Sequence, residues 1–295
     1  MADAPLRNVS DTAHWVALYR AIESERPDAH FRDPYARRLA GERGEQVLRH
    51  MGGGTKGSWP MVVRTVAMDA MLTRLIREQH ADTVVNLAAG LDARPWRMGL
   101  HAELRWIEVD LPAMIEYKRA ALAGETPRCR FESIAADLAD PAARQAVFQR
   151  VAGLTTRAVV LTEGLLVYLA PEQVAALARE LADCGAFRWW ITDIATPRIL
   201  AMLRKRWGSR LAQGNAPMLF APAEGTAFFR PYGWTETEFI STWEEAKRLR
   251  RTPPGSWLWR LMEVFASPQR REVGRRLAGI VLLERAPALT AATDR

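Results

Sequence analysis

The apolar and polar positions divide the chain into two parts with different periodicities. Up to about Gln79, apolar residues recur at helical spacing, and residues 12–25 and 62–77 are predicted to form helices. From Asp82, short apolar runs alternate with helical stretches, which predicts a mostly parallel sheet with helices on both faces. The predicted strands are residues 83–87, 104–109, 130–135, 158–162 and 189–194.

Prolines mark the starts of the predicted helices between these strands. Helices are expected over residues 112–123, 141–152 and 171–184, and each opens with a proline suited to the first helical turn. After Ile194 the alternation of strand and helix stops. The pattern then predicts a helix at 197–212, a glycine- and proline-rich loop at 214–233, a helix at 236–246, and an apolar last strand at 277–283.

The composition is that of a folded globular protein. Of 295 residues, 48% are hydrophobic and 25% are charged, which excludes a disordered chain or a coiled coil. No run of about 18 uncharged apolar residues occurs, so no membrane helix is expected. The first residues carry Asp3 and Asp11 and do not form a secretory signal, and two cysteines give no disulfide framework. We therefore expect a cytoplasmic protein.

The net charge of +7 is concentrated near the C-terminus. Residues 247–285 contain ten Lys or Arg against three Glu, and the rest of the chain is balanced. This segment could form a basic face for nucleic acid. Because arginine and alanine dominate the whole composition, a compositional bias explains the basicity as well, and a nucleic-acid partner is not expected.

Polar residues at the predicted strand ends suggest a nucleoside site, because ligands of open α/β sheets bind beyond these ends. The first strand leads into a small-residue turn with Ala88 and Gly90, where a ligand can approach the backbone. Asp110 ends the second strand, about 20 residues later, where a carboxylate can accept from both ribose hydroxyls. The alternatives are an ordinary tight turn and a solvated acid.

Two further acids follow the next strands. Asp137, with Leu138, can hold an adenine ring, although Asp137 or Asp140 can equally cap the helix that begins at Pro141. Glu163 follows the fourth strand and can either pair with a cationic ligand or form a buried ion pair with an arginine. No histidine or cysteine spacing indicates a metal site, and neither a phosphate-binding loop nor a nucleophile elbow is present.

In combination these segments resemble the bacterial S-adenosylmethionine-dependent methyltransferases related to leucine carboxyl methyltransferases. The resemblance extends over about residues 12–194, and residues 232–234 resemble a later element of the family. Its motifs are TAHWVALYRA at 12–21, FRDPYA at 31–36, VNLAAGLDARP at 85–95, EVDLP at 108–112, Asp137-Leu138, and EGLLVYL at 163–169.

The resemblance implies a class I methyltransferase fold, a Rossmann-like seven-stranded sheet with residues 277–283 as its one antiparallel strand. It implies a single domain, with an N-terminal helical cap (1–79), a cofactor-binding core (80–194), a lid insertion (195–252) and a C-terminal segment (253–295). It further implies that S-adenosylmethionine is the cofactor. The implied cofactor contacts are Arg64, Ala88, Gly90, Asp110, Asp137, Leu138 and Glu163.

The acceptor side is less defined by the sequence. His14 and Tyr168 are the candidate catalytic residues, and Tyr19, Arg20 and Tyr168 are the candidate acceptor contacts. His14 departs from the family pattern, and Ala88 replaces a glycine, which we expect to be compatible with cofactor only if its φ is negative. The sequence does not indicate an oligomeric state.

The expected activity is methyl transfer to a carboxylate or hydroxyl oxygen of a small-molecule acceptor. A carboxylate needs no base at neutral pH, and no unambiguous base is present, which slightly favours carboxylate or acidic phenol acceptors. The alternatives are an NAD-dependent oxidoreductase on a similar sheet, disfavoured by the reduced glycine motif, and a nucleic-acid-binding protein or RNA methyltransferase that uses the basic C-terminal segment.

Overall fold

The computed structural model describes residues 9–52, 54, 57–253, 255–257 and 266–286. Parts of the predicted cap (1–8, 53, 55–56) and of the C-terminal segment (254, 258–265, 287–295) therefore lie outside the described residues. The helices are α1 (Asp11–Ser24), α2 (Ala36–His50), α3 (Trp59–Arg77), α4 (Arg94–Arg97), α5 (Pro112–Ala121), α6 (Pro141–Ala152), α7 (Pro171–Asp183), α8 (Pro197–Gln213), α9 (Thr242–Arg248) and α11 (Pro268–Arg275), with short 3₁₀ turns η2 (Leu166–Tyr168) and η3 (Gly225–Tyr232).

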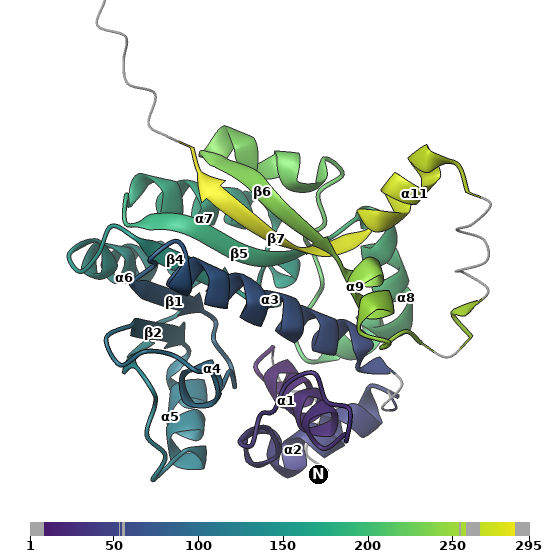
Figure 1. Ribbon diagram of the computed structural model, residues 1–295, viewed down its shortest axis with the longest axis horizontal. Helices are drawn as coiled ribbons and strands as arrows, with labels where there is room; N and C mark the ends of the chain where they lie inside the picture. Colours follow the sequence, from purple (N-terminus) through teal and green to yellow (C-terminus); the bar gives the residue numbers. More distant parts are fainter. Residues whose placement is uncertain (1–8, 53, 55–56, 254, 258–265, 287–295) are drawn as a thin grey trace, which may run out of the picture.

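A seven-stranded sheet forms the centre of the molecule (Figure 1). Its order is β3-β2-β1-β4-β5-β7-β6, and only β7 runs antiparallel to its neighbours β5 and β6. The predicted mostly parallel sheet with one antiparallel strand is confirmed. The strands are β1 (Thr83–Leu87), β2 (Arg105–Asp110), β3 (Arg130–Ala135), β4 (Ala158–Thr162), β5 (Phe187–Ala195), β6 (Trp234–Ser241) and β7 (Ala278–Arg285).

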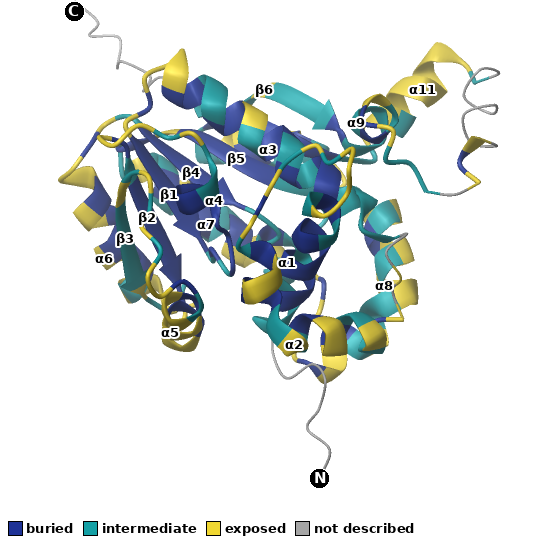
Figure 2. Ribbon diagram, turned by 60° about the horizontal axis from the view of Figure 1, so that its bottom comes forward, coloured by how far each residue is buried: buried dark blue, intermediate teal, exposed yellow. Residues whose placement is uncertain are grey.

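Side chains that alternate along the strands form two separate cores. Val85 and Val160 face one side, where they pack with residues of α6, α7 and η3. Val84 and Leu161 face the other side and pack against α3 and α9. Successive residues of a strand point to opposite faces, so the apolar runs of β1 and β4 are buried on both sides, whereas the edge strands β3 and β6 are only partly buried (Figure 2).

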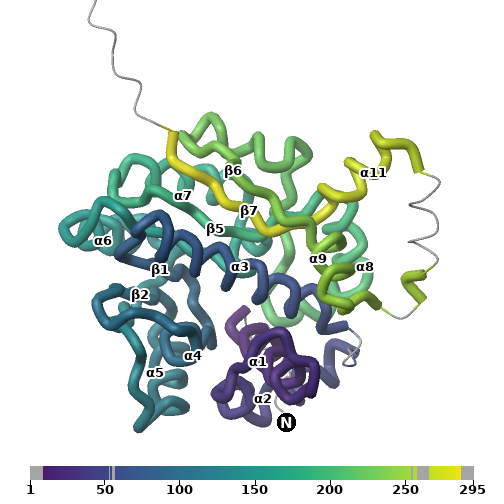
Figure 3. The backbone as a smooth tube through the Cα atoms, viewed as in Figure 1, coloured from purple at the N-terminus to yellow at the C-terminus, as the bar shows by residue number. Residues whose placement is uncertain are grey.

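The order of the strands determines where a ligand can bind. β1 pairs in parallel with both β2 and β4, so the chain changes direction across the sheet between β1 and β4. The loops that follow these strands diverge and leave a crevice at their carboxyl ends. Helices α1 and α2 pack against each other at this edge of the sheet, beside α5 (Figure 3). No helix in the described part of the chain is both long and apolar enough to cross a membrane.

The predicted helix over residues 236–246 is wrong. Residues 234–241 form edge strand β6, and only residues from Thr242 onward form a helix, α9. Threonine alternates with glutamate over residues 235–238, and threonine favours strands. The strand β7 supplies the hydrogen-bonding partner. Because β7 lies about 40 residues later in the chain, local periodicity contained no sign of this pairing.

Gly279 allows β6 and β7 to pair at this edge. A Cβ at this position would lie 2.8 Å from the carbonyl oxygen of Ile240 and would overlap the ring of Phe239. Gly279→Ala should therefore lower the free energy of unfolding by about 1–3 kcal/mol, the usual cost of overpacking. Chemical denaturation measures this, with Gly274→Ala in α11 as the control, because a Cβ there meets no atom within 4 Å. Equal stabilities of the two variants would contradict the prediction.

Candidate functional site

A cavity of about 520 Å³ lies at the carboxyl ends of the parallel strands. Its walls come from α1, the start of α3, the turns after β1, β2, β3 and β4, and the start of α8. The volume falls in the range of small-molecule and cofactor sites. Among the residues predicted from the sequence, it is lined by Arg20, Arg64, Ala88, Gly90, Asp110, Asp137, Leu138, Glu163 and Tyr168.

Asp110 closes the turn that follows β1. Its Oδ2 accepts a hydrogen bond of 2.6 Å from the backbone N–H of Gly90, and its Oδ1 accepts one of 2.7 Å from that of Leu111. Burial raises the pKa of Asp110, and these two hydrogen bonds partly offset that effect. The carboxylate therefore fixes the small-residue turn and lines the cavity at the same time.

Ala88 does not meet the condition of a negative φ that the sequence analysis set for it. Its φ is +51°, in the left-handed region, and the φ of Gly90 is also +51°. The turn from β1 into α4 requires this conformation at both positions, and a residue with a Cβ adopts it only at a cost in energy. The sequence showed the missing glycine but could not show that the backbone keeps the glycine conformation.

Two acids in the turn after β3, Asp137 and Asp140, make different contacts. Asp140 caps α6, because its side chain accepts from the backbone N–H of Ala142 at 2.9 Å. Asp137 is exposed, lines the cavity, and accepts only from the N–H of Ala139 at 2.8 Å. Of the two readings the sequence left open, capping thus belongs to Asp140, and Asp137 has free acceptor capacity beside the half-buried Leu138.

Glu163 takes part in two ion pairs at the floor of the cavity. Its Oε1 lies 3.1 Å from Nε of Arg64, and its Oε2 lies 2.8 Å from Nη1 of Arg94. Burial opposes ionisation of Glu163, but the charges of Arg94 and Arg64 outweigh it and lower its pKa to about 2. The predicted alternative of a buried ion pair is therefore realised, and Glu163 still lines the cavity.

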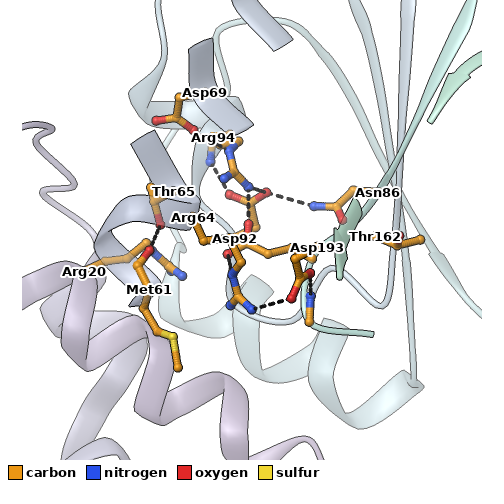
Figure 4. A network of polar contacts seen from close by, with 12 residues as sticks. Arg20, Met61, Arg64, Thr65, Asp69, Asn86, Asp92, Arg94, Thr162 and Asp193 are labelled. Carbon is orange, nitrogen blue, oxygen red and sulfur yellow. Dashed lines mark hydrogen bonds and ion pairs between the residues drawn. The ribbon is translucent and has the colours of Figure 1, made fainter. Parts of the chain in front are cut away.

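These pairs belong to a continuous chain of ion pairs that crosses the site (Figure 4). Nη1 of Arg94 also contacts Asp92 at 2.8 Å, and its Nε contacts Asp69 at 2.6 Å. Asp69 contacts Arg97 at 2.7 Å, and Arg64 reaches Asp193 at 3.4 Å. Asp33 joins Arg97 to Arg20 at the far end.

Sequence reasoning assigned no role to six members of this chain, which are Asp33, Asp69, Asp92, Arg94, Arg97 and Asp193. Asp92 and Arg94 lie in the motif after β1 but had no assigned role, and Asp193 had no assigned role at the end of β5. A signal that could have found Asp193 is its position near the carboxyl end of the predicted strand 189–194, because ligands of such sheets bind beyond these ends. Two of the three acidic partners of Arg94 come from α3 and from the turn after β4, so no local pattern contained these two.

Two of the predicted acceptor-side residues do not line the cavity. His14 packs edge-on against Tyr117, and its Nδ1 contacts the carbonyl oxygen of Ala40 at 3.0 Å. Tyr19 is buried in the cluster formed by α1, α2 and α8. Tyr168 and Arg20 do line the cavity, but Arg20 is already held by Asp33 at 3.0 Å.

The titration of these groups limits their chemistry. Burial lowers the pKa of His14 and raises the pKa of Tyr168, and contacts with Thr12 and Arg64 offset the latter only in part. The phenol of Tyr168 therefore stays protonated near pH 7 and can donate a hydrogen bond. Within the described part of the chain, no group of three or more His, Cys, Asp or Glu side chains is placed to hold a metal ion.

A comparison of the sequence with family models identifies the relationship. The model of leucine carboxyl methyltransferase matches residues 13–182, more than half of the chain. The chain belongs to the leucine carboxyl methyltransferase family. The matched residues include α1 and the turns after β1, β2, β3 and β4, which carry most of the cavity lining.

Relatives of this leucine carboxyl methyltransferase family member occur in Mycolicibacterium and Streptomyces. A putative S-adenosyl-L-methionine-dependent methyltransferase of Mycolicibacterium smegmatis is 36% identical over 214 residues, which cover 68% of this chain and 69% of that protein. A similarly named protein of Streptomyces avermitilis is 30% identical over 264 residues, covering 82% and 89% of the two chains.

Solved structures show the same fold at low sequence identity. A DUF574 family protein from Streptomyces avermitilis superposes with a TM-score of 0.62 at 16% identity, covering 97% of this chain and 99% of that one. A putative methyltransferase from Thermobifida fusca superposes with a TM-score of 0.56 at 14% identity, with 97% of each chain covered. The predicted class I methyltransferase fold is confirmed.

The left-handed conformation of Ala88 gives a testable consequence. Ala88→Gly should raise the free energy of unfolding by about 0.5–1 kcal/mol, because glycine adopts this φ without the Cβ clash. Ala89→Gly is the matched control, because Ala89 is buried and its φ is not positive. In that control variant the free energy of unfolding should fall by about 1 kcal/mol. Urea denaturation of both variants checks the prediction, which fails if Ala88→Gly is destabilised as much as Ala89→Gly.

Proposed function

We propose that the protein transfers a methyl group from S-adenosylmethionine to a carboxylate or hydroxyl oxygen of a small-molecule acceptor. The observation that carries the proposal is the convergence of Gly90, Asp110, Asp137 and Glu163, from four successive strand ends, on one cavity. Family membership supports the reaction class, and the names of the relatives in Mycolicibacterium and Streptomyces support the cofactor.

The residues of the cavity fit this cofactor. Five acids but only three arginines line it, which suits a ligand with a net positive charge. The lining also contains an unused acceptor, because Oδ1 of the buried Asn86 has no hydrogen-bond partner among the described residues. At Gly90 a Cβ would lie 3.1 Å from the Cβ of Ala13, so a side chain would crowd the turn where α1 packs against it.

Each lining residue has a separate proposed role. Asp110 holds the ribose, and Asp137 with Leu138 holds the adenine. Ala88 and Gly90 lie beside the methionine part, and Arg64 with Glu163 binds its polar end. When bound, the cofactor supplies a methyl group already activated by a sulfonium. The chain then has to orient an acceptor oxygen toward that methyl group and exclude water.

The acceptor best supported by the lining is a carboxylate. A hydroxyl acceptor requires proton removal, but no histidine lines the cavity, and Tyr168 stays protonated near pH 7. Glu163 is held by two arginines, which also lower its basicity. A carboxylate is already ionised and can be oriented by the hydroxyl of Tyr168, so we propose an orienting role for Tyr168 and no general base.

The alternatives have less support. A nucleic-acid function relied on the basic C-terminal segment, yet several of its arginines form ion pairs within the protein. Arg248 pairs with Glu245, Arg251 with Glu23 and Asp28, and Arg276 with Glu236. For NAD, the turn after β1 has alanine where a dinucleotide site would have its first glycine.

Two segments that flank the sheet are proposed to cover the bound cofactor and to form the acceptor pocket. Thr12, Trp15 and Val16 of α1 line the cavity from one side, and residues 215–217 with Phe220 line it from the other. Phe229 and Trp234, from the same part of the chain, do not contribute to this wall, because they pack against Trp190 in the core. The chemistry of the acceptor is therefore set mainly by Trp15, Phe220 and Tyr168.

Cofactor binding is the first test. Titration calorimetry should show binding of S-adenosylhomocysteine and much weaker binding of NAD. Asp110→Ala should weaken the binding of S-adenosylhomocysteine by about 1.5–3 kcal/mol, the scale of hydrogen bonds to a charged group. Asp140→Ala, which removes only the cap of α6, serves as the control and should bind normally. Tight NAD binding without a response to S-adenosylhomocysteine would overturn the proposal.

The acceptor class is the second test. Candidate acids and matched hydroxyl compounds are incubated with the protein and methyl-labelled S-adenosylmethionine. Labelled products should form with acids and should release volatile methanol in mild alkali, because methyl esters hydrolyse there and methyl ethers do not. Tyr168→Phe should lower the rate severalfold by removing the orienting hydroxyl, with cofactor affinity preserved. Alkali-stable products formed only from hydroxyl compounds would exclude the carboxylate assignment.

A further inference from the structure

Asp193 is the end of the chain of ion pairs and its most accessible carboxylate at the cavity floor. Its side chain is 27% exposed, against 14% for Glu163 and 10% for Asp92. Asp193 lies near the carboxyl end of β5, lines the cavity, and had no predicted role. The resemblance to the family assigned contacts to Arg64 and Glu163 but none to this residue.

The hydrogen bonds that these acids already accept differ in length. Both oxygens of Glu163 contact arginines at 3.1 Å or less. Both oxygens of Asp92 accept bonds at 2.8–2.9 Å, from Arg94 and from Asn86. Oδ1 of Asp193 accepts from the backbone N–H of Gly164 at 2.6 Å, but Oδ2 has only a 3.4 Å contact with Nη1 of Arg64. Of these three acids, Asp193 has the longest contact and the most exposed side chain, so its Oδ2 is the oxygen best placed to accept a further hydrogen bond from a ligand.

The charge of the whole chain of ion pairs also favours a cationic ligand. Five acids (Asp33, Asp69, Asp92, Glu163 and Asp193) face four arginines (Arg20, Arg64, Arg94 and Arg97), which leaves one negative charge in excess. Because Asp193 is terminal and has one weak arginine contact, the excess charge is least compensated there. A positively charged group in the cavity next to Asp193 would balance it.

We propose that Asp193 binds the α-ammonium group of the cofactor's methionine part through Oδ2, beside the carboxylate-binding Arg64. The inference rests on the proposed function, because it assigns a contact within the same cofactor site. The N–H of Gly164 fixes the orientation of the carboxylate, and Gly164 itself keeps the space open. Its φ is +67°, and a Cβ there would lie 2.9 Å from Nη1 of Arg64.

Three adenosine ligands separate the ammonium contact from other roles. S-adenosylhomocysteine carries both the ammonium and the carboxylate, its decarboxylated analogue keeps only the ammonium, and methylthioadenosine has neither. Their affinities are measured by calorimetry for the wild-type chain and for Asp193→Asn. The amide keeps an oxygen for the N–H of Gly164 but removes the charge. Asp137→Asn is the matched control at the adenine end, and thermal unfolding verifies that each variant is folded.

Asp193→Asn should weaken the binding of S-adenosylhomocysteine and of its decarboxylated analogue about tenfold, which is the effect of one charge-assisted hydrogen bond. The affinity for methylthioadenosine should change less than about twofold. Asp137→Asn should weaken the binding of all three ligands to the same extent. If only S-adenosylhomocysteine is weakened by Asp193→Asn, the residue acts by holding Arg64, and the ammonium contact is excluded. Equal losses for all three ligands, or no loss, also overturn the assignment. If the wild-type chain binds none of the three, the proposed function itself fails.

Discussion

The buried chain of ion pairs from Arg20 to Asp193 is the constraint on which the site depends. It connects α1, α3 and α4 to the ends of β4 and β5, and Arg94 at its centre contacts three acids while its side chain is only 2% exposed. Buried charges of this kind contribute little net stability, but removal of one partner is costly because the other stays desolvated. The chain of ion pairs therefore specifies how the N-terminal helices sit against the sheet, and with them one wall of the cavity.

The conformation of the turn after β1 also depends on a network, here a smaller one of hydrogen bonds. Asp110 comes from β2, yet it holds the N–H of Gly90, and Asp92 in the same turn holds Arg94 and Asn86. These contacts compensate for the left-handed backbone at Ala88, which is costly in isolation. The turn thus keeps a glycine-like conformation without the glycine, because the surrounding hydrogen bonds fix its geometry.

The two halves of the cavity differ in their chemistry. Acids and backbone N–H groups at the strand ends form the half proposed for the cofactor, while Trp15, Val16, Phe220 and the side chains of Ile199 and Leu203 form a more apolar half. The first half lies on the rigid edge of the sheet, and the second comes from helices and a loop outside it. In the proposed assignment, this division separates a cofactor site at the edge of the sheet from an acceptor pocket formed by α1, α8 and residues 215–220.

The sequence by itself determined most of the sheet and half of the site. Apolar runs and helix-starting prolines are local signals, so β1, β3, β4 and α6 were predicted to the residue, and the strand-end positions of Gly90, Asp110, Asp137 and Glu163 followed from them. Only the tertiary structure decided the rest. β6 exists because β7 pairs with it, the φ of Ala88 is positive because distant groups hold the turn, and His14 and Tyr19 face away from the cavity because α1 packs that side on α2 and α8. The contacts of Arg94 with Asp69 and Glu163 and the exposure of Asp193 likewise depend on segments far apart in the chain, whose contacts no local periodicity encodes.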